Sequence, residues 1–295
     1  MSVADQINRI KTNIASTYTA AQAKGATMPQ TQNSDNLAAC VQSITTGGGG
    51  GGTQFGLTVE QMLGTLDGDG NLTYPTLPSI TFTGVKSIPD MSFSNKFSHR
   101  AFEDGASVSF PDLTTVGNSG MNNCFYICTS LTSVDLSALT SVDNKGLGHC
   151  FSSCDSLTSV DLSTLTTVGK YGMDTCFNSC TSLTSVDLSA LTTVGNGGLQ
   201  TCFGGCTSLT SVDLSALTTV SNSGMSSCFG ECTSLTTISF PSLTSVQTYS
   251  FEDCFVDCTA LTEIHFRADA QTAIEAMTGY ADKWGASNAS IIFDL

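Results

Sequence analysis

A 26-residue internal repeat constrains the fold of this chain more than any other feature. All but one of its 13 cysteines fall in two series, and within each series every cysteine follows the previous one after 26 residues. A fixed period of this length is the signature of a repeat protein, in which one structural unit stacks on the next. The first series is Cys124, Cys150, Cys176, Cys202, Cys228 and Cys254, and the second is Cys128, Cys154, Cys180, Cys206, Cys232 and Cys258.

Each repeat contains two apolar patterns, as the unit from Met173 to Gly198 shows. In its first half the apolar residues recur at i, i+3, i+4 and i+7, which predicts a short helix with one buried face. They are Met173, Cys176, Phe177 and Cys180. In its second half Val186 and Leu188 alternate with polar residues, as in a short half-buried strand. One unit is therefore expected to be a strand, an extended return and a short helix.

Stacking must stabilise these units, because one turn cannot bury its own apolar face. Two less regular units, around Ile80 and Val108, precede the six close copies. We predict an α/β fold: a right-handed solenoid with a parallel β-sheet on one side and short helices on the other. The inward strand positions form two columns: Val134, Val160, Val186, Val212, Ile238 and Ile264, and Leu136, Leu162, Leu188, Leu214, Phe240 and Phe266.

Five segments follow from these patterns. In the last of them, a C-terminal cap, the spacing of Ile274, Met277, Ala281 and Trp284 predicts an amphipathic helix, and SIIFDL predicts a final strand. The segments are a helical attachment or oligomerisation segment (1–46), a glycine-rich linker (47–53), a connecting segment and N-terminal cap (54–76), a solenoid of about eight units (77–266) and the C-terminal cap (267–295).

The repeated string CTSLTSVDLSALTTV resembles the BspA-type leucine-rich repeats of bacterial, protist and phage proteins. The resemblance extends roughly from Leu77 to Phe266. The unit here is somewhat longer than is usual in that family and carries an extra cysteine. The resemblance implies a surface adhesion or interaction protein.

Residues 1–46 allow two interpretations. Val3, Ile7, Ile10 and Ile14 follow alternate steps of four and three residues, as in a short coiled-coil seam. The segment either packs on itself as a helical hairpin or joins copies of the chain, in which case a homotrimer is expected. The stretch from Tyr18 to Ile44 also resembles N-terminal attachment segments of phage and prophage structural proteins, which implies phage tail or baseplate proteins as partners.

Net charge excludes some partners and locations. The chain has 10 Lys and Arg against 25 Asp and Glu, a formal charge of −15, so nucleic acid and anionic membrane surfaces would repel it. No run approaches the roughly 18 apolar residues of a membrane span, and the first residues lack the apolar stretch of a Sec signal peptide. We expect a location in the virion (phage tail) or, alternatively, on the bacterial cell surface or outside the cell.

Residues for catalysis or for a cofactor are not evident. The histidines (His99, His149 and His265) fall in different repeats, so no Ser–His–Asp set can be assembled at one level. Asp67, Asp69 and Asn71 begin like a calcium loop, but Leu72 replaces its turn glycine, which favours a hairpin turn. We therefore predict no enzyme, no cofactor and no metal site.

The paired cysteines are expected to be reduced and buried. Residues four apart on a helix have Cβ atoms about 5–6 Å apart, whereas a disulfide needs about 3.8 Å. A thiol also packs well as a small apolar group. Disulfides and a soft-metal site are the less favoured alternatives. In a buried environment Cys180→Ser should place a hydroxyl without a partner and destabilise the fold.

Two surfaces are candidates for a ligand. The strand sequence hardly varies between repeats, whereas the segment around the predicted helix does, and there exposed Tyr, Lys and His offer recognition contacts. Neutral drift explains this variation equally well. The alternative surface is the sheet, where aspartates about 4.8 Å apart could share a weakly bound cation. The first set is Tyr126, Lys145, His149, Lys170, Tyr171 and Tyr249, and the second is Asp135, Asp161, Asp187 and Asp213.

These observations predict a non-enzymatic binding protein. The leading interpretation is a phage or prophage tail solenoid that contacts a protein or glycan on a bacterial cell surface. The alternative is a BspA-like surface or secreted bacterial adhesin that is not part of a virion.

Overall fold

A computed structural model describes residues 65–66, 72–247 and 249–295 of the chain. The chain divides into two compact units, Met1–Pro75 and Thr76–Leu295. In the first unit, β1 (Thr65–Leu66) pairs antiparallel with β2 (Leu72–Thr73), which confirms the hairpin expected here. The predictions for residues 1–64, including the helical segment and the glycine linker, lie outside the described residues.

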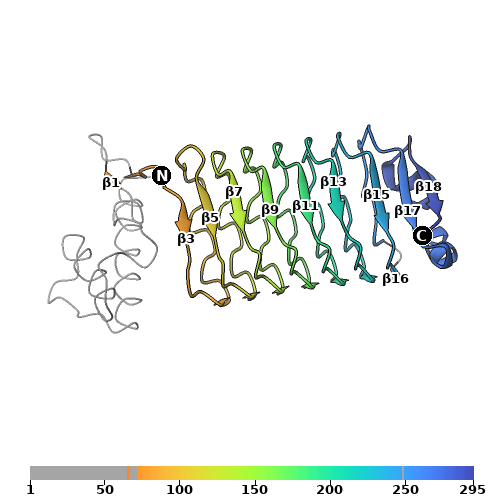
Figure 1. Cartoon of the computed structure of the whole chain (residues 1–295), viewed down its shortest axis with the longest axis horizontal. Coiled ribbons are helices and arrows are strands. Elements are labelled where there is room, and N and C mark those ends of the chain that lie inside the picture. The colour runs from red at the N-terminus through yellow and green to blue at the C-terminus, as the bar shows by residue number, and fades with distance from the viewer. Residues whose placement is uncertain (1–64, 67–71, 248) are drawn as a thin grey trace, which may run out of the picture. The chain divides into compact units, whose positions relative to one another are not determined.

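The second unit is a solenoid whose successive turns lie side by side (Figure 1). Val134 pairs with Val160, one repeat further along, in parallel register, which confirms the predicted parallel solenoid. The first side of the solenoid holds a six-stranded parallel sheet followed by a three-stranded parallel sheet. Their strands are β3 (Ile80–Thr81), β5 (Ser107–Ser109), β7 (Ser133–Asp135), β9 (Ser159–Asp161), β11 (Ser185–Asp187) and β13 (Ser211–Asp213), then β15 (Thr237–Phe240), β17 (Glu263–Phe266) and β18 (Ser290–Phe293).

The segment expected as an extended return forms a second parallel sheet with seven strands. In each of these strands a polar residue is followed by an apolar one that faces the core, as Thr193 and the fully buried Val194 illustrate. Two residues give too short a pattern to indicate a strand in the sequence. The strands are β4 (Ser87–Ile88), β6 (Thr115–Val116), β8 (Ser141–Val142), β10 (Thr167–Val168), β12 (Thr193–Val194), β14 (Thr219–Val220) and β16 (Ser245–Val246).

The third side of each turn is not helical, so the prediction of short helices was wrong. The segment between β10 and β11 is a run of tight turns, in which the Cys176 N–H donates to the carbonyl of Met173 (3.1 Å). The next N–H, that of Phe177, donates instead to the carbonyl of Cys202 in the following repeat (2.9 Å). This alternation lets the third side also join neighbouring turns of the solenoid. We call this segment, residues 169–180 and its equivalents in other repeats, the turn ladder.

Backbone dihedral angles explain why the turn ladder cannot be an α-helix. Every fourth residue has a left-handed conformation, as in Tyr171 (φ 54°), Thr175 (φ 56°) and Ser179 (φ 59°). Yet Cys176, Phe177 and the other apolar residues of the predicted helical face are fully buried. The spacing therefore identified the buried side chains correctly and the backbone conformation incorrectly.

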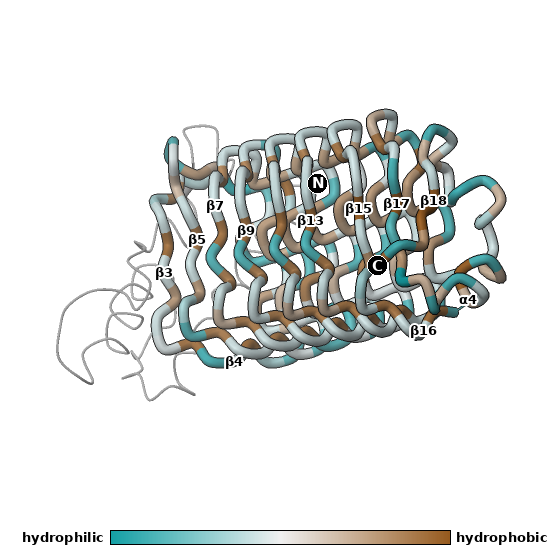
Figure 2. Tube along the Cα trace, turned by 45° about the vertical axis from the view of Figure 1, so that its right-hand side comes forward, coloured by the Kyte–Doolittle hydropathy of each residue, from teal (hydrophilic) through white to brown (hydrophobic). Residues whose placement is uncertain are grey.

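Side chains in the core repeat from turn to turn, as the recurring apolar segments in Figure 2 show. Phe151 and Phe177 stack with ring centroids 5.5 Å apart and planes 6° apart, and the same contact continues along the unit. Such a column buries aromatic surface at every turn and favours exact superposition of the repeats. The column comprises Phe97, Phe125, Phe151, Phe177, Phe203, Phe229 and Phe255.

Threonine hydroxyls add hydrogen bonds between the turns. The hydroxyl of Thr166 donates to the carbonyl of Thr140 (2.9 Å), and that of Thr192 donates to the carbonyl of Thr166 (3.0 Å). An uncharged side chain thus satisfies a backbone carbonyl at the edge of the second sheet. Each of these carbonyls also accepts a backbone N–H, so the hydroxyl adds a second hydrogen bond between the same two turns without adding charge.

Beyond β17 the chain covers the last turn with short helices and β18. The 3₁₀ segments are η1 (Ala268–Ala270) and η2 (Tyr280–Gly285), and the α-helix α4 covers only Gln271–Glu275. Ile274, Met277 and Trp284 are buried as predicted, but Ala281 is exposed. The predicted single helix was wrong, because Gly279 takes a left-handed conformation (φ 83°) and redirects the chain. The predicted final strand is confirmed.

Candidate functional site

The turn ladder brings together three of the six residues predicted for ligand contact. Lys145 and Tyr171 occupy the same position of successive repeats, and Lys170 precedes Tyr171. The Nζ atom of Lys145 lies 6.0 Å from the centroid of the Tyr171 ring, and the Nζ atom of Lys170 lies 5.6 Å from it. Both distances fit a cation–π interaction. We call these three residues the Lys–Tyr cluster.

Gly197, which the sequence analysis did not single out, supports the ring of this cluster. It occupies the position equivalent to Tyr171 in the next repeat, has a left-handed φ of 61° and is buried. A Cβ atom at Gly197 would overlap the ring of Tyr171. The glycine therefore allows the ring to lie directly against the neighbouring turn.

The other predicted contact residues lie apart from the Lys–Tyr cluster or have partners of their own. His149 Nε2 lies 3.9 Å from Asp174 Oδ2 on the turn ladder. Tyr126 packs edge-to-face against His99, with ring centroids 5.3 Å apart. Tyr249 is 44% exposed and lies three repeats beyond Tyr171.

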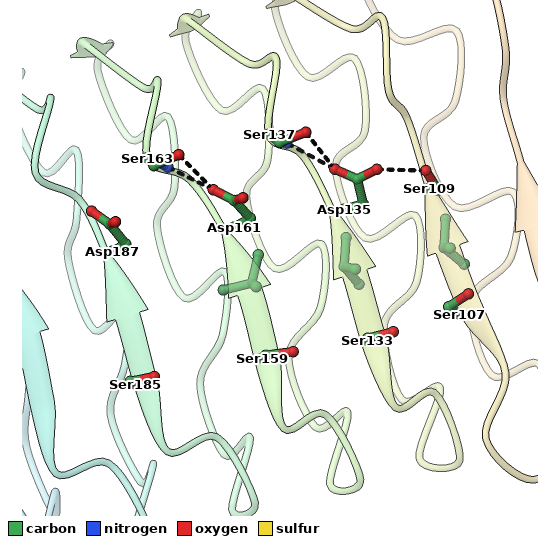
Figure 3. Close-up of a pocket in the computed structure, with 13 residues that line it drawn as sticks. Ser107, Ser109, Ser133, Asp135, Ser137, Ser159, Asp161, Ser163, Ser185 and Asp187 are labelled. Carbon is green, nitrogen blue, oxygen red and sulfur yellow. Dashed lines mark hydrogen bonds between the residues drawn. The ribbon is translucent and has the colours of Figure 1, made fainter.

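On the first side, the predicted aspartate column is present, one carboxylate per strand. Asp161 pairs in register with Asp135 on one neighbouring strand and with Asp187 on the other (Figure 3). Asp213, which pairs with Asp187, continues the column. Each carboxylate accepts a hydrogen bond from the serine two residues later in the chain. Asp161 Oδ1, for example, accepts hydrogen bonds from the backbone N–H (3.0 Å) and the hydroxyl (2.7 Å) of Ser163. A shallow groove lined mostly by serine and aspartate runs over this face. We call it the sheet groove.

Hydrogen bonds lower the pKa of two aspartates of this face. Partial burial raises the pKa of Asp135, but hydrogen bonds from Ser109 and Ser137 outweigh it, so that the pKa lies below its ordinary value. Hydrogen bonds from Ser189 likewise lower the pKa of Asp187. Among residues 72–247 and 249–295, no three Asp, Glu, His or Cys side chains gather in a way that could hold a metal ion. A weak cation along the column stays a prediction.

Both cysteine series are free, buried thiols in the structure. Burial raises their pKa, to about 12 for Cys128 and Cys206, so they are not thiolates near neutral pH. The Sγ atom of Cys180 donates to the carbonyl of Phe151 (3.2 Å). The expectation that a hydroxyl at position 180 would lack a partner was therefore wrong, because this carbonyl can accept from it.

Histidines in the described part of the chain stay in separate repeats. His99 bonds to Ser98, and His149 lies near Asp174. His265 bonds to Asp294 and Glu263. Burial raises the pKa of the Cys150 thiol, next to His149, well above its ordinary value, so this thiol is protonated near neutral pH. Within the same described residues, no helix has the length and apolar character needed to cross a membrane.

Similarity to individual known proteins is low. A comparison with curated proteins finds no match. Among solved structures, a crystal structure of a TLR13–ssRNA13 complex is similar over 63% of this chain, with 16% sequence identity and a TM-score of 0.35. This chain covers 24% of that chain, about a quarter of its length.

The family comparison is more direct. The BspA type leucine rich repeat region matches in six copies, over residues 71–194 and 174–277. These residues contain nearly all of the solenoid, including its turn ladder and sheet groove. Repeats of this family suggest a binding or structural role. The chain belongs to the BspA-type leucine-rich repeat family.

Proposed function

We propose that this protein is a non-enzymatic binding protein of a phage or prophage tail, and that its turn ladder contacts a protein or glycan on a bacterial cell surface. The observation that carries the proposal is the Lys–Tyr cluster. Its two ammonium groups and one aromatic ring stand on a surface otherwise made mostly of small polar side chains. Aromatic and cationic side chains of this kind are common at recognition surfaces.

Stacking of the repeats does not require the Lys–Tyr cluster. The equivalent positions in later repeats hold Gly197 and Ser223, and the backbone hydrogen bonds of the ladder continue through them. Strand residues such as Ser185 and Asp187, in contrast, recur almost unchanged, and Asp187 accepts a hydrogen bond from the backbone N–H of Ser189 (2.9 Å). The variable side chains are thus free to serve recognition, while the repeated ones serve the fold.

The N-terminal resemblance supports the tail assignment. Residues 18–44 resemble phage attachment segments, so this region is the expected contact with tail or baseplate proteins. In this arrangement the glycine run at Gly47–Gly52 acts as a tether between attachment segment and solenoid. A homotrimer would present several solenoids to one surface and raise the effective affinity of a weak contact.

Immunogold electron microscopy tests the assignment. An antibody against the solenoid should label the tails of particles released after prophage induction in a strain that carries this sequence. Binding of the purified full-length chain to cell envelopes of candidate host bacteria should accompany it. Label confined to the bacterial cell surface, with unlabelled particles, would contradict the tail assignment and favour the bacterial adhesin.

A further inference from the structure

Two cations of the Lys–Tyr cluster stand on a strongly acidic protein without an acidic partner. The chain carries a formal charge of −15. Among the residues that the structure describes, Arg267 pairs with Asp269, and His149 and His265 lie within 4.0 Å of carboxylates, whereas neither Lys145 nor Lys170 does. Two neighbouring cations left uncompensated in this way favour the approach of an anion.

Asp174, an acidic residue of the turn ladder, is already engaged, whereas Asp143, two residues before Lys145, is exposed. Asp174 lies 3.9 Å from His149 and accepts a hydrogen bond from the hydroxyl of Thr175 (3.0 Å). Asn144, which precedes Lys145, accepts the N–H of Lys170 (3.2 Å) and so fixes the backbone beside both lysines. The backbone at Lys170 is therefore held by Asn144, and no carboxylate in the described part of the chain lies within 4.0 Å of either lysine ammonium group.

The Tyr171 ring gives the cluster an apolar surface in a fixed position. It lies against Gly197, whose missing side chain leaves room for the ring. Tyr171 is only partly buried, so part of its surface stays accessible. A tyrosine ring in this setting offers both an apolar face and a polar hydroxyl.

These features select a ligand by its chemistry. The sheet groove and the groove beside it on the same face contain none of Lys145, Lys170 and Tyr171, so a ligand of the cluster binds apart from them. A phosphate ion has charge but no apolar face, and an acidic amino-acid side chain has no rigid face. A sugar acid has a carboxylate and a flat set of C–H groups on one ring.

We infer that the Lys–Tyr cluster binds a hexuronate unit of an acidic glycan. On binding, the carboxylate draws the ammonium groups of Lys145 and Lys170 away from the ring, and the C–H face of the sugar packs on the part of the Tyr171 ring that is exposed. This inference rests on the proposed function and names the ligand class for the same surface.

Titration of the full-length chain with methyl β-D-glucuronide tests this inference, with methyl β-D-glucoside as the uncharged match. In amide NMR spectra the glucuronide should shift the signals of Lys170 and Tyr171 and bind at least tenfold more tightly than the glucoside. Its affinity should fall as ionic strength rises, because the contact is exposed. Equal affinity for the two sugars would overturn the inference. So would equal affinity for acetate or inorganic phosphate, which carry charge without a sugar face, or tighter binding of an acidic peptide.

Matched variants assign the binding to the cluster. Lys145→Met and Lys170→Met keep the aliphatic stem, and the double variant should bind the glucuronide at least fivefold more weakly. Tyr171→Leu should weaken the binding of both the glucuronide and the glucoside. Lys96→Met removes an exposed lysine elsewhere on the solenoid and should leave affinity unchanged. Unchanged affinity in the double variant, with unaltered thermal unfolding, would overturn the assignment.

The experiments distinguish a wrong hexuronate inference from a wrong proposed function. If envelopes bind through the cluster but the glucuronide does not, the hexuronate inference is wrong and the binding function stands. If the glucuronide binds at the cluster but no envelope does, the inference stands and contact with a bacterial surface is wrong.

Discussion

The Sγ atom of Cys180 donates a 3.2 Å hydrogen bond to the carbonyl of Phe151 in the preceding repeat. The Phe151 carbonyl also accepts a hydrogen bond from the N–H of Cys154 (3.2 Å), so the thiol bonds to the second lone pair of the carbonyl oxygen. The extra cysteine of each repeat therefore ties one turn to the next. The same bond joins Cys128 to Phe97, Cys154 to Phe125, Cys206 to Phe177, Cys232 to Phe203 and Cys258 to Phe229.

Serine substitutions should distinguish the two cysteine series. Cys180→Ser keeps a donor for the Phe151 carbonyl, whereas the fully buried Cys176 sulfur lies beside the backbone of Phe151 without the thiol-to-carbonyl hydrogen bond that the second series makes. Cys176→Ser should lower the free energy of unfolding by about 1–3 kcal/mol, and Cys180→Ser by less than about 1 kcal/mol. Urea unfolding followed by circular dichroism measures both. Cys180→Ala is the control, and it should lower the free energy of unfolding by more than Cys180→Ser does. A larger loss for Cys180→Ser than for Cys176→Ser would contradict this role of the thiol.

Native thiols should resist alkylation far above neutral pH. Burial raises the pKa of Cys206 to about 12 and that of the less buried Cys258 to about 11. With iodoacetamide at pH 8.5, mass spectrometry should find these thiols unmodified in the folded chain and fully modified in urea. As the pH rises, Cys258 should react first. Rapid labelling of Cys176 in the folded protein would show that the core opens more easily than this packing implies.

Stability near neutral pH should depend on His265. Its hydrogen bond to Asp294 raises its pKa above 6.5, with Glu263 assisting and partial burial opposing. A raised folded-state pKa gives stability that is complete below the unfolded value and is lost as the pH rises through the folded value. The melting temperature should therefore decrease from pH 6 to pH 8 by more in the parent protein than in His265→Gln. The His99→Gln control should keep the parent dependence. Identical pH profiles for the parent and His265→Gln would exclude this contribution.

Residues 1–46 should control the oligomeric state. The seam of Val3, Ile7, Ile10 and Ile14 covers only two heptads, so it needs further packing from the rest of the segment. Light scattering should give a trimer for the full-length chain and a monomer for residues 54–295. A full-length chain that is monomeric at micromolar concentration would contradict the trimer.

The repeat length fixed most of what could be predicted about the fold. A period of 26 places Val160 beside Val134 and Phe177 beside Phe151, and both contacts are present. The turn ladder could not be predicted in this way, because a helix and a run of tight turns bury the same i, i+3, i+4 and i+7 positions. Gly197 and Gly205, both with positive φ, were the available signal, but Thr201 between them also has positive φ and is not a glycine.

The candidate site was predictable only in part. Equal spacing places Lys145 and Tyr171 on neighbouring turns, as the structure shows. The contacts of Lys170 and Gly197 with the ring depend on the backbone conformation of the turn ladder, which the sequence pattern did not reveal. The hydrogen bond from Cys180 to Phe151 was missed for the same reason, since it depends on the direction of one carbonyl.

The most direct test of the central claim measures how two variants bind to cell envelopes of a bacterium that the parent protein binds. One variant replaces Lys145, Lys170 and Tyr171 by serine on the turn ladder, and the other, Asp161→Ser with Asp187→Ser, alters the sheet groove. Both sets of side chains are at least partly exposed, so both variants should fold, and circular dichroism checks this. We predict at least tenfold weaker binding of the first variant and unchanged binding of the second. Unchanged binding of the first, with loss in the second, would contradict the account and move the binding surface to the sheet.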